Sequence, residues 1–248
     1  MRLLVANANT TEAITALCAD AASAAASPGT TIIPATPRFG PAVIATRAEN
    51  IVAGHALLAL LAEYAGQVDG VLLAVSHDTA LEAARQLMPC PVVAMTEAAC
   101  LTACLTACLT GGRFDLITFG ATETYRERIA QHGLSARLAG LAGIDATPQE
   151  AVRNPAGIAV KLLAGIAALV AEGADAIVLG GAALAGMAPR LQPRSPVPLL
   201  DGIACGVHLL EMLVALRLPK PRVGSFAAPQ GRVAGGIEAP LAALLRGG

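Results

Sequence analysis

The sequence predicts an α/β fold built on parallel strands, and three observations support this. Strand-like and helix-like patterns alternate along all 248 residues, as they do in βα units whose helices cover both faces of a sheet. The apolar residues, 55% of the chain, are mostly small or aliphatic and only 2% of residues are aromatic, which favours helices packed closely on a sheet over a β-sandwich. Two apolar runs, 70–75 and 176–180, each end in a turn of the kind that follows a buried parallel strand.

The individual elements follow from these patterns. Strands are expected at Arg2–Ala6, Thr31–Pro34, Val71–Val75, Val92–Met95, Phe114–Thr118, Ala176–Leu179 and Val197–Leu200. Helices are expected at Thr11–Ala26, Glu49–Tyr64, Ala80–Met88, Ala99–Leu109, Glu123–His132, Pro155–Ala171, Gly186–Leu191 and Ile203–Leu216.

Helix ends carry the expected signals. Thr10 and Thr11 precede the first helix, with Glu12 beside them, and Asn154-Pro155 opens another. Gly173 closes that second helix, because glycine adopts the left-handed conformation just past a last turn.

The chain also looks doubled. A strand ending in Asn7 is followed two elements later by the strand ending in Ser76, and strands ending in Thr118 and Gly181 repeat this order. Two such halves would form a cleft between opposed strand ends, where ligands bind in open α/β sheets. We assign residues 1–98 with 203–248 to the first half and 99–202 to the second. Residues 217–248, punctuated by Pro and Gly with one short helix, are expected to form a surface extension or an interface segment.

Composition excludes several classes of partner. The net charge is −1 and the pI about 6.4, without a basic tail, so we expect no nucleic acid partner. The most apolar stretch, near 158–170, is interrupted by Lys161 and too short to cross a bilayer. The first residues enter a strand without the basic region and cleavage site of a leader. We therefore expect a cytoplasmic protein with a small-molecule substrate, no membrane partner and a homo-oligomeric state.

The six cysteines follow no metal-binding spacing. Cys100, Cys104 and Cys108 recur within a threefold Ala-Cys-Leu-Thr repeat and would share one side of a helix. A face for a soft metal is one interpretation. We prefer the other, small residues packing a helix on a sheet, and we expect no metal.

Asn7-Ala-Asn9-Thr10-Thr11 directly follows the opening strand. Its amides and hydroxyls, beside a helix N-terminus, would donate hydrogen bonds to an anionic group. The same residues also suit a plain helix cap and turn.

Ser76-His77-Asp78-Thr79 follows the third strand. A contiguous Ser-His-Asp is not a catalytic triad, because neighbouring side chains diverge. Ser76 stands where a nucleophile would stand, Asp78 and Thr79 suit the cap of the next helix, and His77 suits a solvated loop position as well as a base.

Three further motifs lie at strand ends: Glu97 at a helix start, Thr118-Phe119-Gly120 with Tyr125-Arg126 in the helix that follows, and Asp201-Gly202. Each also reads as an ordinary strand end or cap.

Together these motifs resemble the aspartate/glutamate/hydantoin racemase superfamily, and most of all its hydantoin and allantoin racemase branch. The opening Asn7–Thr11 is similar to that branch's Asn-Pro-Asn-Thr-Thr. Gly40, Pro41 and Ile44 match Gly-Pro-x-x-Ile, 91–99 is similar to Pro-Val-x-Gly-x-x-Glu-Ala-Ala, and 198–202 is similar to Pro-Val-Ile-Asp-Gly. The resemblance covers roughly residues 2–216. It implies two Rossmann-like halves related by pseudo-twofold symmetry, an active site in the cleft between them, and no cofactor.

The resemblance also implies where the catalytic groups belong. In these racemases a cysteine ends the middle strand of each half, and the two thiols exchange a Cα proton from opposite faces. Those positions correspond to Ser76 and Gly181 here. A thiol with an ordinary pKa of about 8.5 can become a thiolate near neutrality, whereas a serine needs a neighbouring base and a glycine has no group to offer. Two-thiol racemisation is therefore excluded at these positions.

We expect Ser76, His77, Asp78 and Gly181 to mark the catalytic positions. Asn7, Asn9, Thr10, Ile44, Thr79, Thr118, Gly120 and Ala182 are expected to bind the substrate, partly through backbone N–H groups at helix starts.

Three functions remain open. The leading hypothesis is one-sided, cofactor-independent hydrolysis, elimination or decarboxylation of a small carboxylate, amide or hydantoin-like compound through Ser76, for which the superfamily's arylmalonate decarboxylases, with one cysteine and one glycine, give a precedent. The alternative is a hydantoin or amino-acid racemase or isomerase with relocated acid and base groups (Cys205, Asp78 or Glu97). The third is a ligand-binding protein without catalysis.

Overall fold

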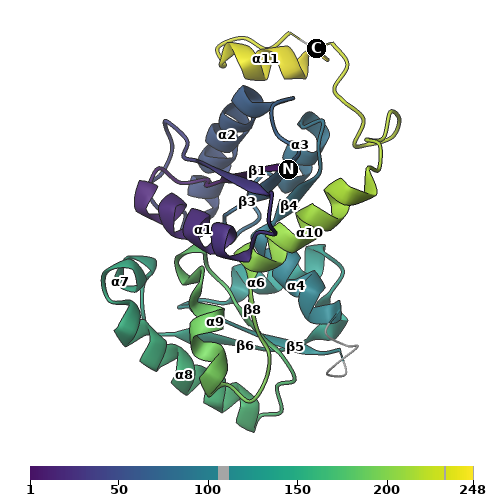
Figure 1. Ribbon diagram of the computed structural model, residues 1–248. Helices are drawn as coiled ribbons and strands as arrows, with labels where there is room; N and C mark the ends of the chain where they lie inside the picture. The colour runs from purple at the N-terminus through teal and green to yellow at the C-terminus, as the bar shows by residue number, and fades with distance from the viewer. Residues whose placement is uncertain (106–111, 232, 248) are drawn as a thin grey trace.

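Two four-stranded parallel sheets organise the molecule, one in each half (Figure 1). The computed structural model describes residues 1–105, 112–231 and 233–247. The strand order is β2-β1-β3-β4 in the first sheet and β6-β5-β7-β8 in the second. The second half therefore repeats the topology of the first, and the predicted two-halved α/β fold is confirmed.

The first sheet is enclosed by helices on both faces. Its elements are β1 (Arg2–Ala6), α1 (Glu12–Ala25), β2 (Thr31–Ala35), α2 (Arg47–Tyr64), β3 (Gly70–Leu73), α3 (Leu81–Leu87) and β4 (Val92–Ala94). Side chains alternate along β1, so Leu3 and Val5 pack with α1 while Leu4 and Ala6 pack with α2. Burial on both faces explains why β1 and β3 read as continuous apolar runs.

The second sheet is enclosed in the same way. Its elements are β5 (Phe114–Phe119), α6 (Glu123–Gln131), β6 (Leu138–Ile144), α7 (Pro148–Arg153), α8 (Pro155–Ala171), β7 (Ile177–Leu179), α9 (Met187–Leu191) and β8 (Leu199–Asp201), with single 3-10 turns at Ser135–Arg137, Ala182–Leu184 and Gln192–Arg194. Helices α8 and α9 cover one face and α6 the other, together with α4 (Met95–Leu105).

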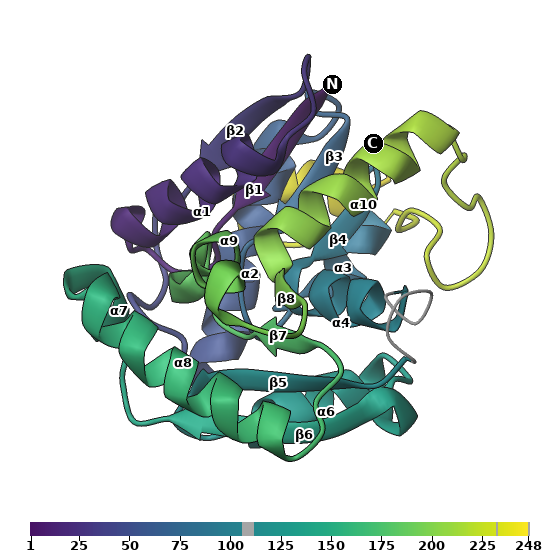
Figure 2. The ribbon, with the colours of Figure 1, turned by 60° about the horizontal axis from the view of Figure 1, so that its bottom comes forward.

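The chain crosses between the halves twice. Helix α4 leaves the first sheet directly after β4, and α10 (Gly202–Leu216) returns to it directly after β8. The two crossing helices pack along each other (Figure 2). One continuous apolar core joins the halves, since Leu3 and Val207 belong to the same buried cluster as Ile117 and Leu179. The predicted boundary at 98/99 falls within α4 and the one at 202/203 at the start of α10; the division into domains stays a prediction.

Two elements of the structure were not predicted. Strand β6 has the sequence Leu-Ala-Gly-Leu-Ala-Gly-Ile, which lacks the β-branched residues that signal a strand until its last position. Its glycines permit a close approach: a Cβ on Gly143 would lie 1.9 Å from the carbonyl oxygen of Gly120. The other element is α7, whose capping box joins Thr147 and Glu150.

The remaining expected elements lie within a few residues of their predicted bounds. Asn154 caps α8 by accepting a hydrogen bond from Gly157 N–H, and Gly173 adopts a φ of +96° after that helix. Residues 106–109 of the predicted helix 99–109, with Cys108, lie outside the described residues.

The C-terminal segment ends in a short helix, α11 (Ala239–Leu245), which packs on α2 through Leu241. In the described ranges, no helix is both long enough and apolar enough to span a membrane.

Candidate active site

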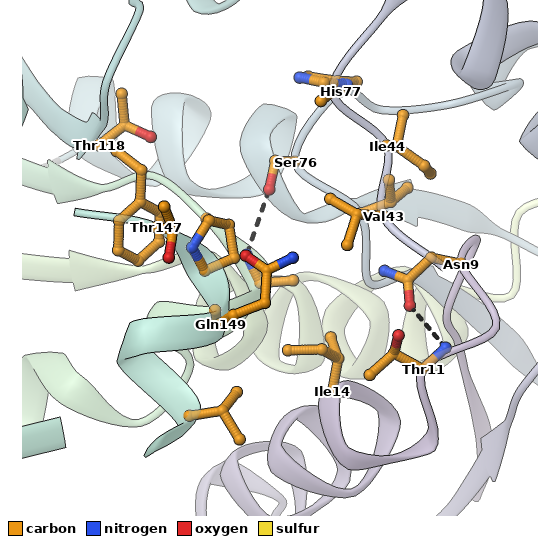
Figure 3. A pocket seen from close by; sticks show the side chains of 18 of the residues that line it. Asn9, Thr11, Ile14, Val43, Ile44, Ser76, His77, Thr118, Thr147 and Gln149 are labelled. Atoms are coloured by element: carbon orange, nitrogen blue, oxygen red, sulfur yellow. Dashed lines mark hydrogen bonds between the residues drawn. The ribbon is translucent and has the colours of Figure 1, made fainter. Parts of the chain in front are cut away.

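A cavity of about 780 Å³ lies between the two halves, at the ends of β3, β5 and β7. Its walls come from the turns that follow these strands, from the start of α1, from the 42–45 loop before α2, and from α7. Figure 3 shows side chains from these segments around one space. The carboxyl ends of parallel strands are where α/β sheets bind ligands, and here two such edges share one cavity.

Ser76 connects the two halves within this cavity. Its Oγ accepts a hydrogen bond of 3.2 Å from the backbone N–H of Ala182, which follows Gly181 in the second half (Figure 3). The backbone of Ser76 is also fixed, because its carbonyl oxygen accepts a 2.8 Å hydrogen bond from Thr96 Oγ1 at the start of α4. The structure thus brings Ser76, Gly181 and Ala182 together, as the sequence predicted.

Tyr125 lines the pocket, although the sequence motif that contains it gave it no role at the site. Its phenol is buried in the wall of the pocket and forms hydrogen bonds with the side chains of Ser76 and Thr118. Burial raises the pKa of Tyr125, although these hydrogen bonds oppose the shift, so the phenol stays protonated at neutral pH. Ser76, Thr118 and Tyr125 form a group of three neutral hydroxyls, which we call the hydroxyl cluster.

The Gly181 turn offers backbone only. Gly181 has a φ of +139°, a conformation that glycine adopts without strain and other residues rarely adopt. A Cβ at this position would lie 3.2 Å from the ring of Phe119. Gly181 itself therefore supplies no acid or base group to the pocket.

The loop after β1 divides into a buried part and a pocket part. Asn7 is buried and donates from Nδ2 to Asn9 Oδ1 (3.0 Å) and Thr15 Oγ1 (3.0 Å), so it holds the loop in place. Asn9 and Thr11 line the pocket, while Thr10 lies outside the lining and its N–H bonds to the carbonyl oxygen of Pro41.

The wall opposite the hydroxyl cluster is mainly apolar. Ile14 of α1, Val43 and the predicted Ile44 contribute to it, as does Val152 of α7. Helix α7 also brings Arg153 to the lining. The Thr147-Pro-Gln-Glu150 sequence, a capping box with Pro at its first helical position, is the signal that could have located this wall.

Besides Asn7 and Thr10, three further predicted site residues lie outside the lining of the pocket. Asp78 is buried behind Ser76, Thr79 is buried and donates to Asn50 Oδ1 at 2.6 Å, and Gly120 lies at an exposed turn between two lining residues. Thr79 and Asp78 thus secure the turn from behind rather than facing the cavity.

The side chain of Asp78 is held by three hydrogen-bond donors. Its carboxylate accepts from the N–H groups of Thr96 (3.1 Å) and Glu97 (3.0 Å) and from His132 Nε2 (2.8 Å), and its own N–H donates to the carbonyl oxygen of Val75. Burial raises the pKa of Asp78, while the hydrogen bond and charge of His132 act against that shift.

His77 lines the pocket beside Ser76. Burial lowers its pKa, and the charge of Arg128 lowers it further. The imidazole is consequently neutral at neutral pH and able to accept a proton.

The relocated acid and base groups considered from the sequence do not reach the cavity. Glu97 is paired with Arg85 (2.6 Å) and Cys205 lies on α10, and neither lines the pocket. Burial raises the pKa of Cys205 to about 11, so its thiol stays protonated.

Metal ligation finds no support among the described residues, which contain no group of three or more His, Cys, Asp or Glu placed to hold an ion. Cys100 is buried in the core under α4 and Cys104 packs beside it, as expected for packing residues. Cys108 lies outside the described residues.

The comparisons with known proteins agree on one family. The Asp/Glu/Hydantoin racemase family model matches residues 3–210. The allantoin racemase from Klebsiella pneumoniae is similar with a TM-score of 0.89 and 33% identity, covering 97% of this chain and 98% of that one. The allantoin racemase from Pseudomonas fluorescens has a TM-score of 0.88 and 30% identity over 95% of this chain and 100% of its own.

A hydantoin racemase from Paenarthrobacter aurescens is 30% identical over 237 residues, which cover 92% of this chain and 98% of the relative. These matches extend through both sheets and through both turns that face the cavity. The chain belongs to the Asp/Glu/hydantoin racemase family.

Proposed function

We propose that this protein is an isomerase that inverts a carbon next to a ring carbonyl in a hydantoin-like compound. The observation that carries the proposal is the direct contact between Ser76 and Ala182, which places the ends of both sheets around one cavity. Similarity over nearly the whole chain to allantoin and hydantoin racemases supports the same substrate class.

The hydroxyl cluster, to which both halves contribute, supplies the hydrogen-bond donors of the proposed reaction. Removal of the ring proton moves electrons onto the adjacent carbonyl oxygen, and protonated hydroxyls stabilise the developing negative charge. Ser76 and Tyr125 donate to that oxygen, while the neutral imidazole of His77 accepts the proton.

The opposite face differs, because Gly181 offers no side chain. In this proposal, water that enters beside Gly181 gives a proton to the second face of the carbon, and the proton held by His77 neutralises the hydroxide that remains. Such a route needs no thiol, and it predicts that inversion is accompanied by exchange of the ring hydrogen with solvent.

Deuterium exchange tests the proposal. Single enantiomers of allantoin and of hydantoins with apolar substituents are incubated with the protein in D₂O, and both isotope content and optical rotation are followed. We expect inversion with one deuterium gained per turnover, above the spontaneous rate. Ligand-dependent thermal stabilisation without exchange would instead support a binding protein.

Two substitutions test the roles of the residues. Ser76→Ala and Tyr125→Phe each remove one hydroxyl donor, and we expect each to lower kcat about 10- to 1,000-fold, as for single donors of an oxyanion site. Ser225→Ala and Tyr64→Phe are the matched controls, since both lie outside the pocket lining. Unchanged kcat in Ser76→Ala would remove Ser76 from the mechanism.

One-sided chemistry is a second candidate, favoured by the placement of hydroxyls beside Ser76 and of bare backbone at Gly181. Hydrolysis, elimination or decarboxylation of a small acid, amide or ring needs groups on one face only. The test differs in its product: a changed carbon skeleton or an opened ring, in place of the opposite enantiomer.

Introducing a cysteine in each of the two turns tests independently whether both turns face one substrate. Gly181→Cys is combined with Ser76→Cys and, in a second variant, with Val75→Cys, because Val75 also lines the pocket. We expect one of the two pairs to increase hydantoin racemisation. The thiol at 181 requires the backbone to leave its φ of +139°, so folding of each variant is checked first.

A further inference from the structure

A buried group of charged side chains lies directly behind the Ser76 turn and takes no part in the proposed chemistry. The imidazole of His132, at the end of α6, stands between two carboxylates. Its Nε2 lies 2.8 Å from Asp78 Oδ2 and its Nδ1 lies 3.9 Å from Glu97 Oε1. Arg85 of α3 pairs with the other oxygen of Glu97 at 2.6 Å. Two acidic and two basic groups thus balance one another behind the turn.

This group is connected to the pocket through a short series of hydrogen bonds. Asp78 accepts from the N–H of Thr96, and Thr96 Oγ1 donates to the carbonyl oxygen of Ser76. Asp78 itself has a φ of +48°, an uncommon conformation for an aspartate that its buried carboxylate helps to hold. A change in the hydrogen bonds of the Asp78 carboxylate is therefore expected to alter the position of Ser76. Because Ser76 Oγ accepts from the N–H of Ala182, the environment of that N–H would change as well.

Helix α6 is attached to the Ser76 turn at two points. Tyr125 near its start bonds to the Ser76 side chain, and His132 just after its end bonds to Asp78. A seven-residue separation places both side chains on the same face of the helix. The phenol and the imidazole therefore act on the same turn from one rigid element.

We propose that His132 is a positioning residue whose charged imidazolium, by holding Asp78, keeps Ser76 in contact with the second half of the molecule. A carboxylate that is buried without a cationic partner is strongly disfavoured. When His132 loses its proton, the hold on Asp78 weakens and the Ser76–Ala182 contact loosens. The inference concerns the shape of the pocket and goes beyond the proposed reaction; only its effect on turnover rests on that reaction.

The charges around His132 fix the direction of its titration. Burial alone would lower the pKa of His132, but the hydrogen bond and charge of Asp78, together with Glu97, raise it above its ordinary value, and Arg85 opposes them. Arg128, on the same helix, faces His77, whose pKa is lowered. The two histidines near Ser76 consequently titrate in separate pH ranges, with His132 in the higher one.

Amide NMR of the isotope-labelled full chain tests this coupling without any substrate. The reporter is the N–H of Ala182, which lies in the other half of the molecule and donates to Ser76 Oγ. We expect this resonance to shift with the pKa of the His132 ring, measured in the same samples. In His132→Gln the upper titration of Ala182 disappears, whereas in His208→Gln, a change on the exposed face of α10, it remains.

Asp78→Asn provides a second variant in case His132→Gln does not fold. It removes the charge that holds the imidazolium, so the pKa of His132 falls and the titration of Ala182 moves down with it. The inference is overturned if the Ala182 resonance does not shift as His132 titrates. It is also overturned if that resonance titrates in both variants as it does in the native protein.

Turnover separates this inference from the proposed function. If the isomerase proposal holds, kcat declines on the alkaline side with the same pKa as His132, and His132→Gln lowers kcat more than it changes KM. Absence of turnover on every hydantoin overturns the proposed function alone, because the NMR titration decides the role of His132.

Discussion

The two turns that face the cavity occupy equivalent places in two halves of the same topology, yet they are built differently. The Ser76 turn carries hydroxyls and is backed by Asp78, His132, Glu97 and Arg85. The Gly181 turn carries no polar side chain, and the nearby buried carboxylate of Asp201 accepts hydrogen bonds from the backbone N–H groups of Gly186 and Ile203. The two halves therefore share the position of this turn, but the residues in it give each turn a different chemistry.

The largest expected effect comes from breaking the charged group on the Ser76 side. His132→Leu leaves the buried Asp78 carboxylate without its cationic partner, which is expected to lower the free energy of unfolding by about 3–5 kcal/mol. Urea unfolding at neutral pH measures this loss.

His208→Leu is the control, since the side chain of His208 is 62% exposed; we expect a change within about 0.5 kcal/mol. Equal losses in the two variants would show that the Ser76 turn does not depend on its buried charges.

At the Gly181 turn we expect stability to depend on the size of the side chain rather than on its charge. Gly181→Ala places a Cβ 3.2 Å from Phe119 in a backbone conformation with φ of +139°, so we expect a loss of about 1–3 kcal/mol from backbone strain. Thermal unfolding compares it with Gly235→Ala, where a Cβ meets open space. A neutral Gly181→Ala would mean that this turn relaxes easily.

The pH dependence of stability sharpens the comparison. The pKa of His132 is raised in the folded protein, so its stabilising effect is fully present below the unfolded-state pKa of about 6.5 and is lost as pH rises through the folded-state pKa. The advantage of the native protein over His132→Gln should shrink by about 1 kcal/mol across that range, less than for a fully buried charged hydrogen bond because solvent reaches part of the ring.

Urea unfolding of both proteins from pH 5 to pH 9 measures this difference. An advantage that grows with pH has the wrong sign and would place the pKa of His132 below that of the unfolded chain.

The smallest effect is expected for the contact between the turns. Ser76→Ala removes the acceptor of the Ala182 N–H, which costs about 0.5–1.5 kcal/mol for a partly buried hydrogen bond. Hydrogen exchange at the Ala182 amide measures it directly, and exchange as slow as in the native protein would argue that another group takes the N–H.

The fold was predictable because burial on both sheet faces leaves unbroken apolar runs in the sequence. Strand β6 was missed for a physical reason: small residues allow Gly143 to approach Gly120 closely, and small residues do not signal a strand. Helix α7 had a readable capping box, but it is only six residues long.

The sequence could predict those parts of the site that depend on residues close together in the chain. Ser76, Thr118 and Gly181 lie at or just after the carboxyl ends of strands, so the sequence alone could place them where the two sheets face a ligand. Tyr125 and His132 could not be placed in this way, because each acts through a partner about fifty residues away along the chain, and periodicity carries no information on such pairs. Asp78 was expected at a catalytic position because it follows Ser76 and His77 in the sequence; its carboxylate instead bonds to Thr96, Glu97 and His132 behind the turn.

The two crossings of the chain, through α4 and α10, bear on how a ligand reaches the cavity. Because these two helices pack on each other, both connections between the halves lie in one place. Helix α7 lies far from this pair, on the other side of the molecule (Figure 2). We expect any opening of the cavity to occur beside α7, because the packed helices α4 and α10 join the halves elsewhere.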